Sequence, residues 1–244
     1  MPRAEILDWE RPQHYELAKR NAKVIIACRN DIKGEAVARS IKIKTGNPFV
    51  YCSHLDLGNQ RSIREFVQDF LSKESALHVL INNAAYMGPR ATTDDGYERT
   101  FGVNYLGHFY LTYLLQDRLK KCGPSRIINI ASDAIKKGKL DFDDLPLRNY
   151  DIYGAYARSK ASLGMFTIEA HRRWFDDTVV SYAVHPGYKT WSIDNKADIK
   201  HARSIDNNAV RWSSLCFTPR TDKMLIRIYF TPFNIRWSSL YFTP

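Results

Sequence analysis

The stretch KVIIAC at 23–28, followed by DIKGEAVARSIK at 31–42, decides the fold that this sequence predicts. A short and continuously apolar run is typical of a strand buried on both faces of a sheet. In the second stretch, apolar residues recur at intervals that place them roughly on one face of a helix. These residues are Ile32, Ala36, Val37 and Ile41. A strand followed by an amphipathic helix is the repeating unit of an α/β protein.

The same alternation continues along the chain. Further strands are expected at 48–57, 77–84, 125–132 and 178–184. Helices are expected between them, at about 62–71, 103–121 and 152–174. Strands separated by helices pair in parallel through right-handed crossovers. The sequence therefore predicts a three-layer, doubly wound α/β fold with a mostly parallel sheet, in one domain over 1–190, whose ligands bind beyond the carboxyl ends of the strands.

Both ends of the chain depart from this alternation. Residues 1–22 hold a helical segment at 14–22 but no convincing strand before it. The segment 191–244 lacks the strand–helix rhythm and repeats itself, because RWSSLCFTP at 211–219 returns as RWSSLYFTP at 236–244. Two copies are too few for a solenoid. We read this segment as an atypical tail of unrelated origin, with a functional peptide repeat as the alternative.

The net charge of the chain excludes few classes of binding partner. Lys and Arg exceed Asp and Glu by 36 to 26, which gives a net charge of +10. Such a balance attracts nucleic acid, anionic membranes and anionic cofactors alike. The basic residues occur as scattered pairs with no recognised nucleic-acid motif, so we expect no nucleic-acid partner.

The cysteines and the apolar runs indicate a location. The chain has four cysteines, none at C-x-x-C spacing: Cys28, Cys52, Cys122 and Cys216. We therefore expect no zinc or other metal site, and a reducing compartment. No apolar run approaches the ~18 residues of a membrane span, and the start lacks the apolar stretch of a signal peptide. The expected location is the cytoplasm.

Ser132, Tyr156 and Lys160 are the strongest candidates for catalysis. Tyr156 and Lys160 are four positions apart on an expected helix, so they share a face. A free tyrosine hydroxyl, with a pKa near ~10, is a poor acid–base group at neutral pH, but a nearby ammonium lowers that pKa. Ser132 ends an expected strand, where its hydroxyl can bond a substrate oxygen. Together the three are suited to polarise a carbonyl and pass it a proton, although Y-x-x-x-K alone also occurs on ordinary helix surfaces.

An ordered set of motifs over 14–190 resembles the short-chain dehydrogenase/reductase family, most closely its retinol dehydrogenase-type members. The matching stretches are VIIACRN (24–30), LDL (55–57), LHVLINNAA (77–85), FGVNYLGHFYLTYLL (101–115), RIINIAS (126–132), GKLDFDDL (138–145), YARSK (156–160) and YAVHPG (182–187). The resemblance implies a Rossmann-like fold and a nicotinamide cofactor. It also assigns the catalytic roles. Tyr156 would donate the proton to the carbonyl, Lys160 would hold the nicotinamide ribose and depress the pKa of Tyr156, and Ser132 would orient the substrate oxygen. Asn104 would support a water-mediated relay to the lysine.

The same resemblance names cofactor-binding residues. Asp56 would meet the adenine edge, and Asn83 would lie beside the adenosine. Pro186 and Gly187 would shape the loop over the nicotinamide, and Thr190 would bond its carboxamide. Tyr188 and Lys189 make that loop atypical for the family.

Arg29 bears on the choice between NAD and NADP. An acidic residue after this strand of a dinucleotide fold binds the ribose 2′-hydroxyl of NAD, whereas an arginine suits the 2′-phosphate of NADP. The guanidinium fork also matches phosphate geometry. The sequence therefore favours NADP(H) over NAD(H), with an ordinary exposed charge as the alternative reading of Arg29.

The start of the chain departs from the family. The family opens with a strand and a T-G-x-x-x-G-x-G loop whose backbone approaches the pyrophosphate, but this chain has no glycine before Gly34. The missing strand lies in the middle of the family's sheet, so two rows of backbone groups lose partners unless AEILD (4–8) serves as a makeshift strand. Ala85 also replaces a usual glycine. A shortened or alternatively spliced product, or a mis-assembled gene model, would explain these departures.

Two functions follow from the resemblance. The first is an NADP-dependent oxidoreductase that interconverts an alcohol and a carbonyl on a small hydrophobic substrate, such as a retinoid, a steroid or a lipid aldehyde. The alternative is a truncated and inactive relative that acts through binding or dimerisation. The family often pairs through the helices that carry Asn104 and Tyr156, which implies a homodimer. Its retinol dehydrogenase-type members often carry a membrane anchor, which implies a membrane-peripheral location as the alternative to the cytoplasm.

Overall fold

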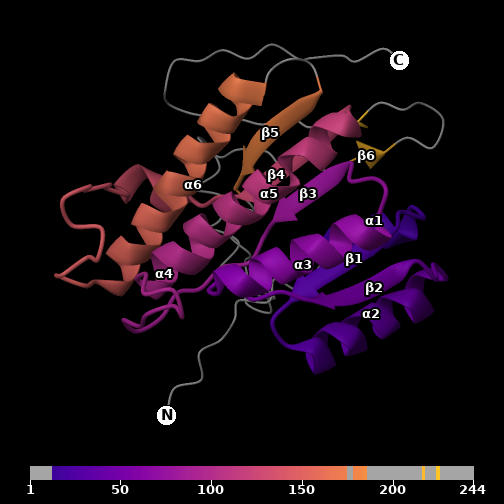
Figure 1. Ribbon diagram of the computed structural model, residues 1–244, viewed down its shortest axis with the longest axis horizontal. Coiled ribbons are helices and arrows are strands. Elements are labelled where there is room, and N and C mark those ends of the chain that lie inside the picture. The colour runs from indigo at the N-terminus through magenta and orange to yellow at the C-terminus, as the bar shows by residue number, and fades with distance from the viewer. Residues whose placement is uncertain (1–12, 175–177, 186–215, 218–223, 226–244) are drawn as a thin grey trace, which may run out of the picture. The chain divides into compact units, whose positions relative to one another are not determined.

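The structure is a computed structural model that describes residues 13–174, 178–185, 216–217 and 224–225 (Figure 1). The chain divides into two units, Met1–Pro186 and Gly187–Pro244. In the second unit, β6 (Cys216–Phe217) pairs antiparallel with β7 (Met224–Leu225). The expected makeshift strand at 4–8 lies outside the described residues.

Strands and helices alternate through the first unit, which confirms the α/β class. In chain order the elements are α1 (Gln13–Lys19), β1 (Val24–Cys28), α2 (Asp31–Thr45), β2 (Val50–His54), α3 (Gln60–Lys73), β3 (Val79–Asn82), α4 (Arg99–Phe101), the π-helix η1 (Gly102–Gly107), α5 (His108–Lys121), β4 (Ser125–Ile130), the 3-10 helix η2 (Asp133–Lys137), α6 (Ile152–Trp174) and β5 (Val179–Val184).

The helices form two layers on opposite faces of the strands. Along β1, Val24 packs into a core with α1 and α2, whereas its neighbour Ile25 packs into the core under α3 and α5. Successive residues of a strand point to opposite faces, so these two cores lie on either side of the sheet. Figure 1 shows α3, α5 and α6 together over one face. The three-layer arrangement is the one predicted.

Helix α2 buries only part of the face that its apolar spacing predicts. Ile41 is buried and Val37 packs against the core as expected, but Ile32 is 85% exposed, and Gly34 and Ala38 are buried instead. A Cβ atom at position 34 would lie 2.3–2.4 Å from the sulfurs of two strand cysteines. The small side of α2 therefore packs closely on the strands, and this close approach outweighs the pattern of larger apolar residues.

The parallel strands form two separate sheets among the described residues, β1–β2 and β3–β4–β5. The same apolar core, with α3 and α5, packs against strands of both sheets. In one sheet the Val24 N–H donates to the Phe49 carbonyl at 2.9 Å, and in the other the Arg126 N–H donates to the His78 carbonyl at 2.8 Å. Parallel pairing alternates along a strand, so the next residues turn their backbone groups away from these partners.

The alternation leaves one row of backbone groups on β1 and one on β3 without a partner strand in the described part of the chain. On β1 the N–H and C=O groups of Ile25 and Ala27 point away from β2. On β3 those of Val79 and Ile81 point away from β4. No strand among the described residues pairs with either edge.

No helix in the described ranges is long and apolar enough to cross a membrane.

Amide hydrogen exchange will report the open edges directly. We expect the amides of Ile25, Ala27, Val79 and Ile81 to exchange about fivefold faster than those of Ile26 and Leu80, because one net backbone hydrogen bond is worth about 1 kcal/mol. Residue-resolved exchange by NMR measures the ratio within each strand, so neighbouring residues serve as controls. Equal protection of both sets would show that a further strand pairs with these edges.

Candidate active site

Ser132 lies just beyond the carboxyl end of β4. It is the N-cap residue of η2, where its Oγ accepts a hydrogen bond from the Ala134 N–H at 3.2 Å. The chain turns sharply at this point because the capped helix begins directly after the strand. The serine hydroxyl is thereby fixed at the edge of the sheet where the sequence predicts the site.

Tyr156 and Lys160 are one turn apart on α6, with the Lys160 Nζ 5.6 Å from the centroid of the Tyr156 ring. Lys160 is 2% exposed, and its Nζ donates to the carbonyl of Ile130, the last residue of β4, at 2.6 Å. This bond joins the helix to the strand. The Ser132 hydroxyl also lies close enough to the Tyr156 phenol to favour its charged form. The structure therefore brings together the three groups that the sequence nominates.

Burial sets the protonation of this site. The pKa of Tyr156 is raised above 10 because the ring is desolvated, although the hydrogen bond with Ser132 acts in the opposite direction. Burial lowers the pKa of Lys160 from 10.5 to about 8. The resemblance implies that the Lys160 ammonium depresses the pKa of Tyr156, whereas the pKa in this structure is raised, because burial of the phenol disfavours its charged form.

Asn104 lies in the π-helix η1, at 0% exposure. Its Nδ2 donates to the Ser159 Oγ at 3.0 Å and to the Tyr86 carbonyl at 2.9 Å, and its Oδ1 accepts from the Tyr86 N–H at 2.6 Å. These bonds join the segment after β3 to α6, next to Lys160. Because π-helical turns are frequent at functional sites, the local distortion agrees with a role there.

The π-helix also packs closely on the segment after β2. A Cβ atom on Gly107 would lie 2.3 Å from the Leu57 carbonyl oxygen, so only glycine fits this contact. Next along the chain, His108 is 2% exposed and its Nδ1 is 3.0 Å from the Asn104 carbonyl oxygen. Burial lowers the pKa of His108 to about 4, which keeps the ring neutral. We interpret His108 as a structural residue that stabilises η1.

The three described cofactor candidates lie after the first three strands. Arg29 follows β1 and is exposed. Asp56 follows β2, and its Oδ1 accepts from the Gly58 N–H at 2.8 Å. Asn83 follows β3 and is exposed, whereas its neighbour Asn82 is buried. The carboxyl ends of parallel strands share one edge, so all three stand where dinucleotides bind in such folds.

The remaining cofactor candidates, Pro186, Gly187 and Thr190, lie outside the described residues. Within the described ranges, no group of three or more His, Cys, Asp or Glu side chains could hold a metal ion.

The sequence reading overlooked a buried polar network beneath the site. Asn82 on β3 donates to the Asn129 Oδ1 on β4 at 2.7 Å and to the Thr112 Oγ1 on α5 at 3.1 Å. Asn129 in turn donates to Thr167 on α6 and Ser181 on β5. The signal was one asparagine in each of two apolar strands, and these two are direct partners in the register. The network links β3, β4 and β5 to the helices α5 and α6.

The chain matches known proteins in both sequence and fold. The family model described as short chain dehydrogenase matches residues 14–200. The chain belongs to this family. Mouse (Mus musculus) retinol dehydrogenase 13 is 47% identical over 175 residues, which cover 70% of this chain and 52% of that protein. Human (Homo sapiens) retinol dehydrogenase 12 is 47% identical over 174 residues, or 70% of this chain and 55% of that protein.

Human polyprenol dehydrogenase is a further relative within the short-chain dehydrogenases. It is 44% identical over 162 residues, which cover 64% of this chain and 49% of that protein. The chain thus spans about half the length of the curated relatives it matches.

Solved structures share the fold. An uncharacterised protein from Mycobacterium paratuberculosis has a TM-score of 0.64 at 35% identity, over 82% of this chain and 71% of that one. A metagenomic short-chain oxidoreductase in complex with NADP has a TM-score of 0.58 at 22% identity, over 78% and 82% of the two chains. The second likeness shows the fold alone.

The buried lysine gives the stability of the protein a specific pH dependence. Between its pKa of about 8 in the folded protein and 10.5 in the unfolded chain, the unfolded state binds more protons, so the free energy of unfolding rises with pH. We expect the difference in the free energy of unfolding, taken as the parent value minus the Lys160→Met value, to rise over this range by up to about 1.4 kcal/mol per pH unit. Urea unfolding from pH 7 to 10.5 measures it, with exposed Lys121→Met as control. A difference that stays flat with pH would contradict the burial of this ammonium.

Proposed function

We propose that the protein is an NADP-dependent oxidoreductase that interconverts an alcohol and a carbonyl on a hydrophobic substrate. The observation that carries the proposal is the convergence of Ser132, Tyr156 and Lys160 at the end of β4 in a chain of this family. The names of its relatives, retinol and polyprenol dehydrogenases, point to long apolar alcohols as the substrate class.

The substrate oxygen would sit between the hydroxyls of Ser132 and Tyr156. The raised pKa of Tyr156 keeps its phenol protonated at neutral pH, so it can donate a proton to the oxygen of a carbonyl as that oxygen gains charge. Ser132 would hold the same oxygen through a second hydrogen bond. With a pKa of about 8, Lys160 is largely protonated at pH 7 and places a positive charge beside the tyrosine ring.

The residues present fit the adenosine half of a nicotinamide dinucleotide. When bound, this cofactor supplies or accepts the hydride. The exposed guanidinium of Arg29 suits a 2′-phosphate, and Asp56 and Asn83 would line the adenosine side. We propose that Lys160 holds the ribose next to the nicotinamide.

The second candidate is a binding protein without catalytic activity. Two observations favour it: the sequence before Gly34 contains no glycine loop for the pyrophosphate, and β1 and β3 each keep an open edge in the described part of the chain. The catalytic groups stand on β4 and α6, whereas Arg29 and Asp56 follow the strands of the other sheet. A complete catalytic corner is therefore compatible with weak dinucleotide binding.

We also propose that the protein forms a homodimer through α5 and α6. Their outer faces carry large apolar side chains at 40–71% exposure: Phe109, Tyr113, Met165 and Ile168. The Phe109 ring on α5 packs against the Phe166 ring on α6, and exposed apolar side chains around such a contact are typical of an interaction site. Sedimentation velocity should give twice the mass of one chain, and a single-chain mass at micromolar concentration would reject this pairing.

Cofactor titration and turnover separate the two functions. If the protein is an oxidoreductase, we expect calorimetry to show that NADPH binds with micromolar affinity and more tightly than NADH. We also expect NADPH oxidation in the presence of retinal or other long-chain aldehydes. Tyr156→Phe should retain the cofactor affinity and lose about 100-fold or more in turnover, because it removes only the proton donor. Tyr153→Phe, which changes an exposed tyrosine on the same helix, is the matched control.

Two outcomes count against the proposal. Turnover of Tyr156→Phe equal to that of the parent would refute the mechanism. Absence of binding at millimolar NADPH would leave the binding protein as the better account.

A further inference from the structure

A buried ion pair joins α6 to the segment before α4, apart from the catalytic corner formed by Ser132, Tyr156 and Lys160. The side chains of Arg158 on α6 and of Glu98 before α4 are each 2% exposed, and their charged atoms approach to 3.5 Å. Removing two charges from water is costly, so such a pair persists only where further hydrogen bonds satisfy it. The partners of each member therefore show what the pair holds together.

Glu98 fixes the segment that leads to Asn104. As the N-cap residue of α4, its carboxylate accepts from the Thr100 N–H at 2.7 Å and from the Phe101 N–H at 2.9 Å. Helix α4 continues directly into η1, which carries Asn104. One end of the ion pair is therefore part of the support of the candidate active site.

Arg158 fixes the loop at 138–151. Its Nη1 donates to the Asp144 carbonyl at 3.1 Å and to the Leu145 carbonyl at 2.9 Å. The guanidinium also lies 4.8 Å from the centroid of the Phe101 ring. A single arginine thus contacts α4 and two consecutive carbonyls of the loop.

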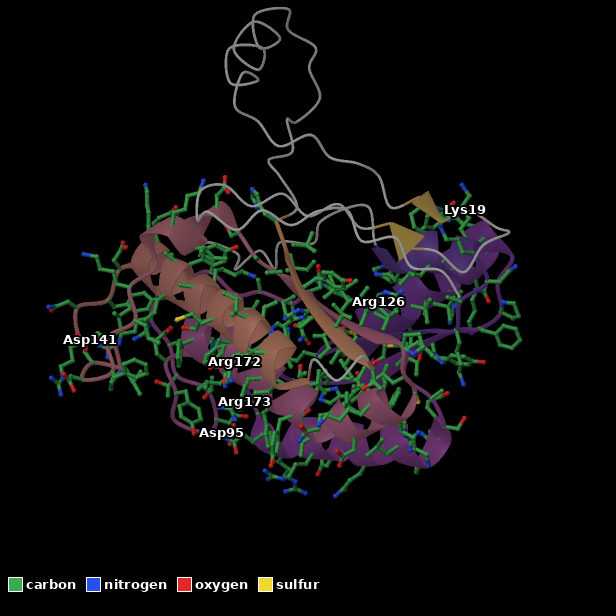
Figure 2. All side chains as sticks on the ribbon, turned by 90° about the horizontal axis from the view of Figure 1, so that it is seen from above. Lys19, Asp95, Arg126, Asp141, Arg172 and Arg173 are labelled. Carbon is green, nitrogen blue, oxygen red and sulfur yellow. The ribbon has the colours of Figure 1, made fainter. Side chains whose placement is uncertain are left out.

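The loop joins the two halves of the catalytic corner. It leaves η2, which Ser132 caps, and it enters α6 four residues before Tyr156. Figure 2 shows Asp141 on this loop beyond the first turns of α6, with Arg172 and Arg173 far along the helix. A second tether holds its end, where the Tyr150 hydroxyl donates to the Gly88 carbonyl at 2.7 Å. Between these ends, Arg158 is a buried charged contact to the backbone of the loop, and the exposed Arg90 also donates to the Pro146 carbonyl at 3.5 Å.

We propose that Arg158 is a positioning residue, which clamps the loop 138–151 against α4 and α6 and thereby sets the placement of Tyr156 relative to Ser132. The consequence for turnover rests on the proposed function, whereas the placement itself does not. Lysine is a poor substitute, because one ammonium does not reproduce the planar fork that reaches Glu98 and both carbonyls.

The decisive variant is the double change Arg158→Met with Glu98→Gln. It removes both charges, so no buried charge remains unpaired, and the glutamine oxygen still accepts one of the two backbone N–H bonds at the start of α4. The single change Arg158→Lys tests the geometry of the fork. Arg172→Met, which changes an exposed arginine of the same helix, is the matched control.

Limited proteolysis with thermolysin measures the clamp. This protease cleaves beside large apolar residues such as Phe142. The methionines that the variants introduce at 158 and 172 lie on α6, so the sites within 138–151 are the same in every variant. We expect cleavage within 138–151 to become at least about tenfold faster in the double variant, intermediate in Arg158→Lys and unchanged in the control. The rates are compared below the midpoint of thermal unfolding of each variant. Cleavage at the parental rate would overturn the proposal.

The Tyr156 ring signal in ¹³C-tyrosine NMR, assigned with Tyr156→Phe, measures the placement. It should shift in the double variant and stay fixed in Arg172→Met. A released loop with an unmoved Tyr156 signal would reduce Arg158 to a merely structural role and overturn the proposal. If the parent turns over substrate, kcat should fall about tenfold with little change in the KM for cofactor. If the parent is inactive, proteolysis and NMR still decide the proposal, so the two failures remain distinguishable.

Discussion

The hydrogen bond from the Lys160 ammonium to the Ile130 carbonyl is the contact on which the candidate active site depends. A charge at 2% exposure needs an acceptor, and the last carbonyl of β4 supplies one. The bond therefore fixes the height of α6 along β4. Tyr156, one turn earlier, then reaches Ser132, which caps the next helix. Burial of the lysine and placement of the tyrosine are two consequences of one packing arrangement.

The candidate catalytic groups and the candidate cofactor residues depend on different parts of the fold. The corner and the asparagine network beneath it stand on β3, β4 and β5 with α5 and α6. Arg29 and Asp56 follow β1 and β2, which form a separate sheet among the described residues. The proton-transfer groups can thus be in place while the binding of a dinucleotide still depends on how the two sheets are held together.

Much of this architecture was predictable from sequence because it rests on local patterns. Short apolar runs predicted the strands, and the four-residue spacing of Tyr156 and Lys160 predicted a shared helix face. The predictions failed where three-dimensional packing decides. The close approach of Gly34 to the strands exposes Ile32, and burial of the ring raises the pKa of Tyr156. The buried asparagine pair needed the strand register, which no single segment encodes.

The pKa of the Tyr156 phenol tests the packing of α6 on β4 most directly, because it depends on both the burial of the ring and its contact with Ser132. Its pKa can be followed by ¹³C-tyrosine NMR, with the resonance assigned by its loss in a phenylalanine variant. The account predicts a pKa above 10 that rises further in Ser132→Ala, because that change removes a hydrogen bond favouring the phenolate. A phenol that titrates at its ordinary pKa, with no change in Ser132→Ala, would show that Tyr156 is neither buried nor in contact with Ser132.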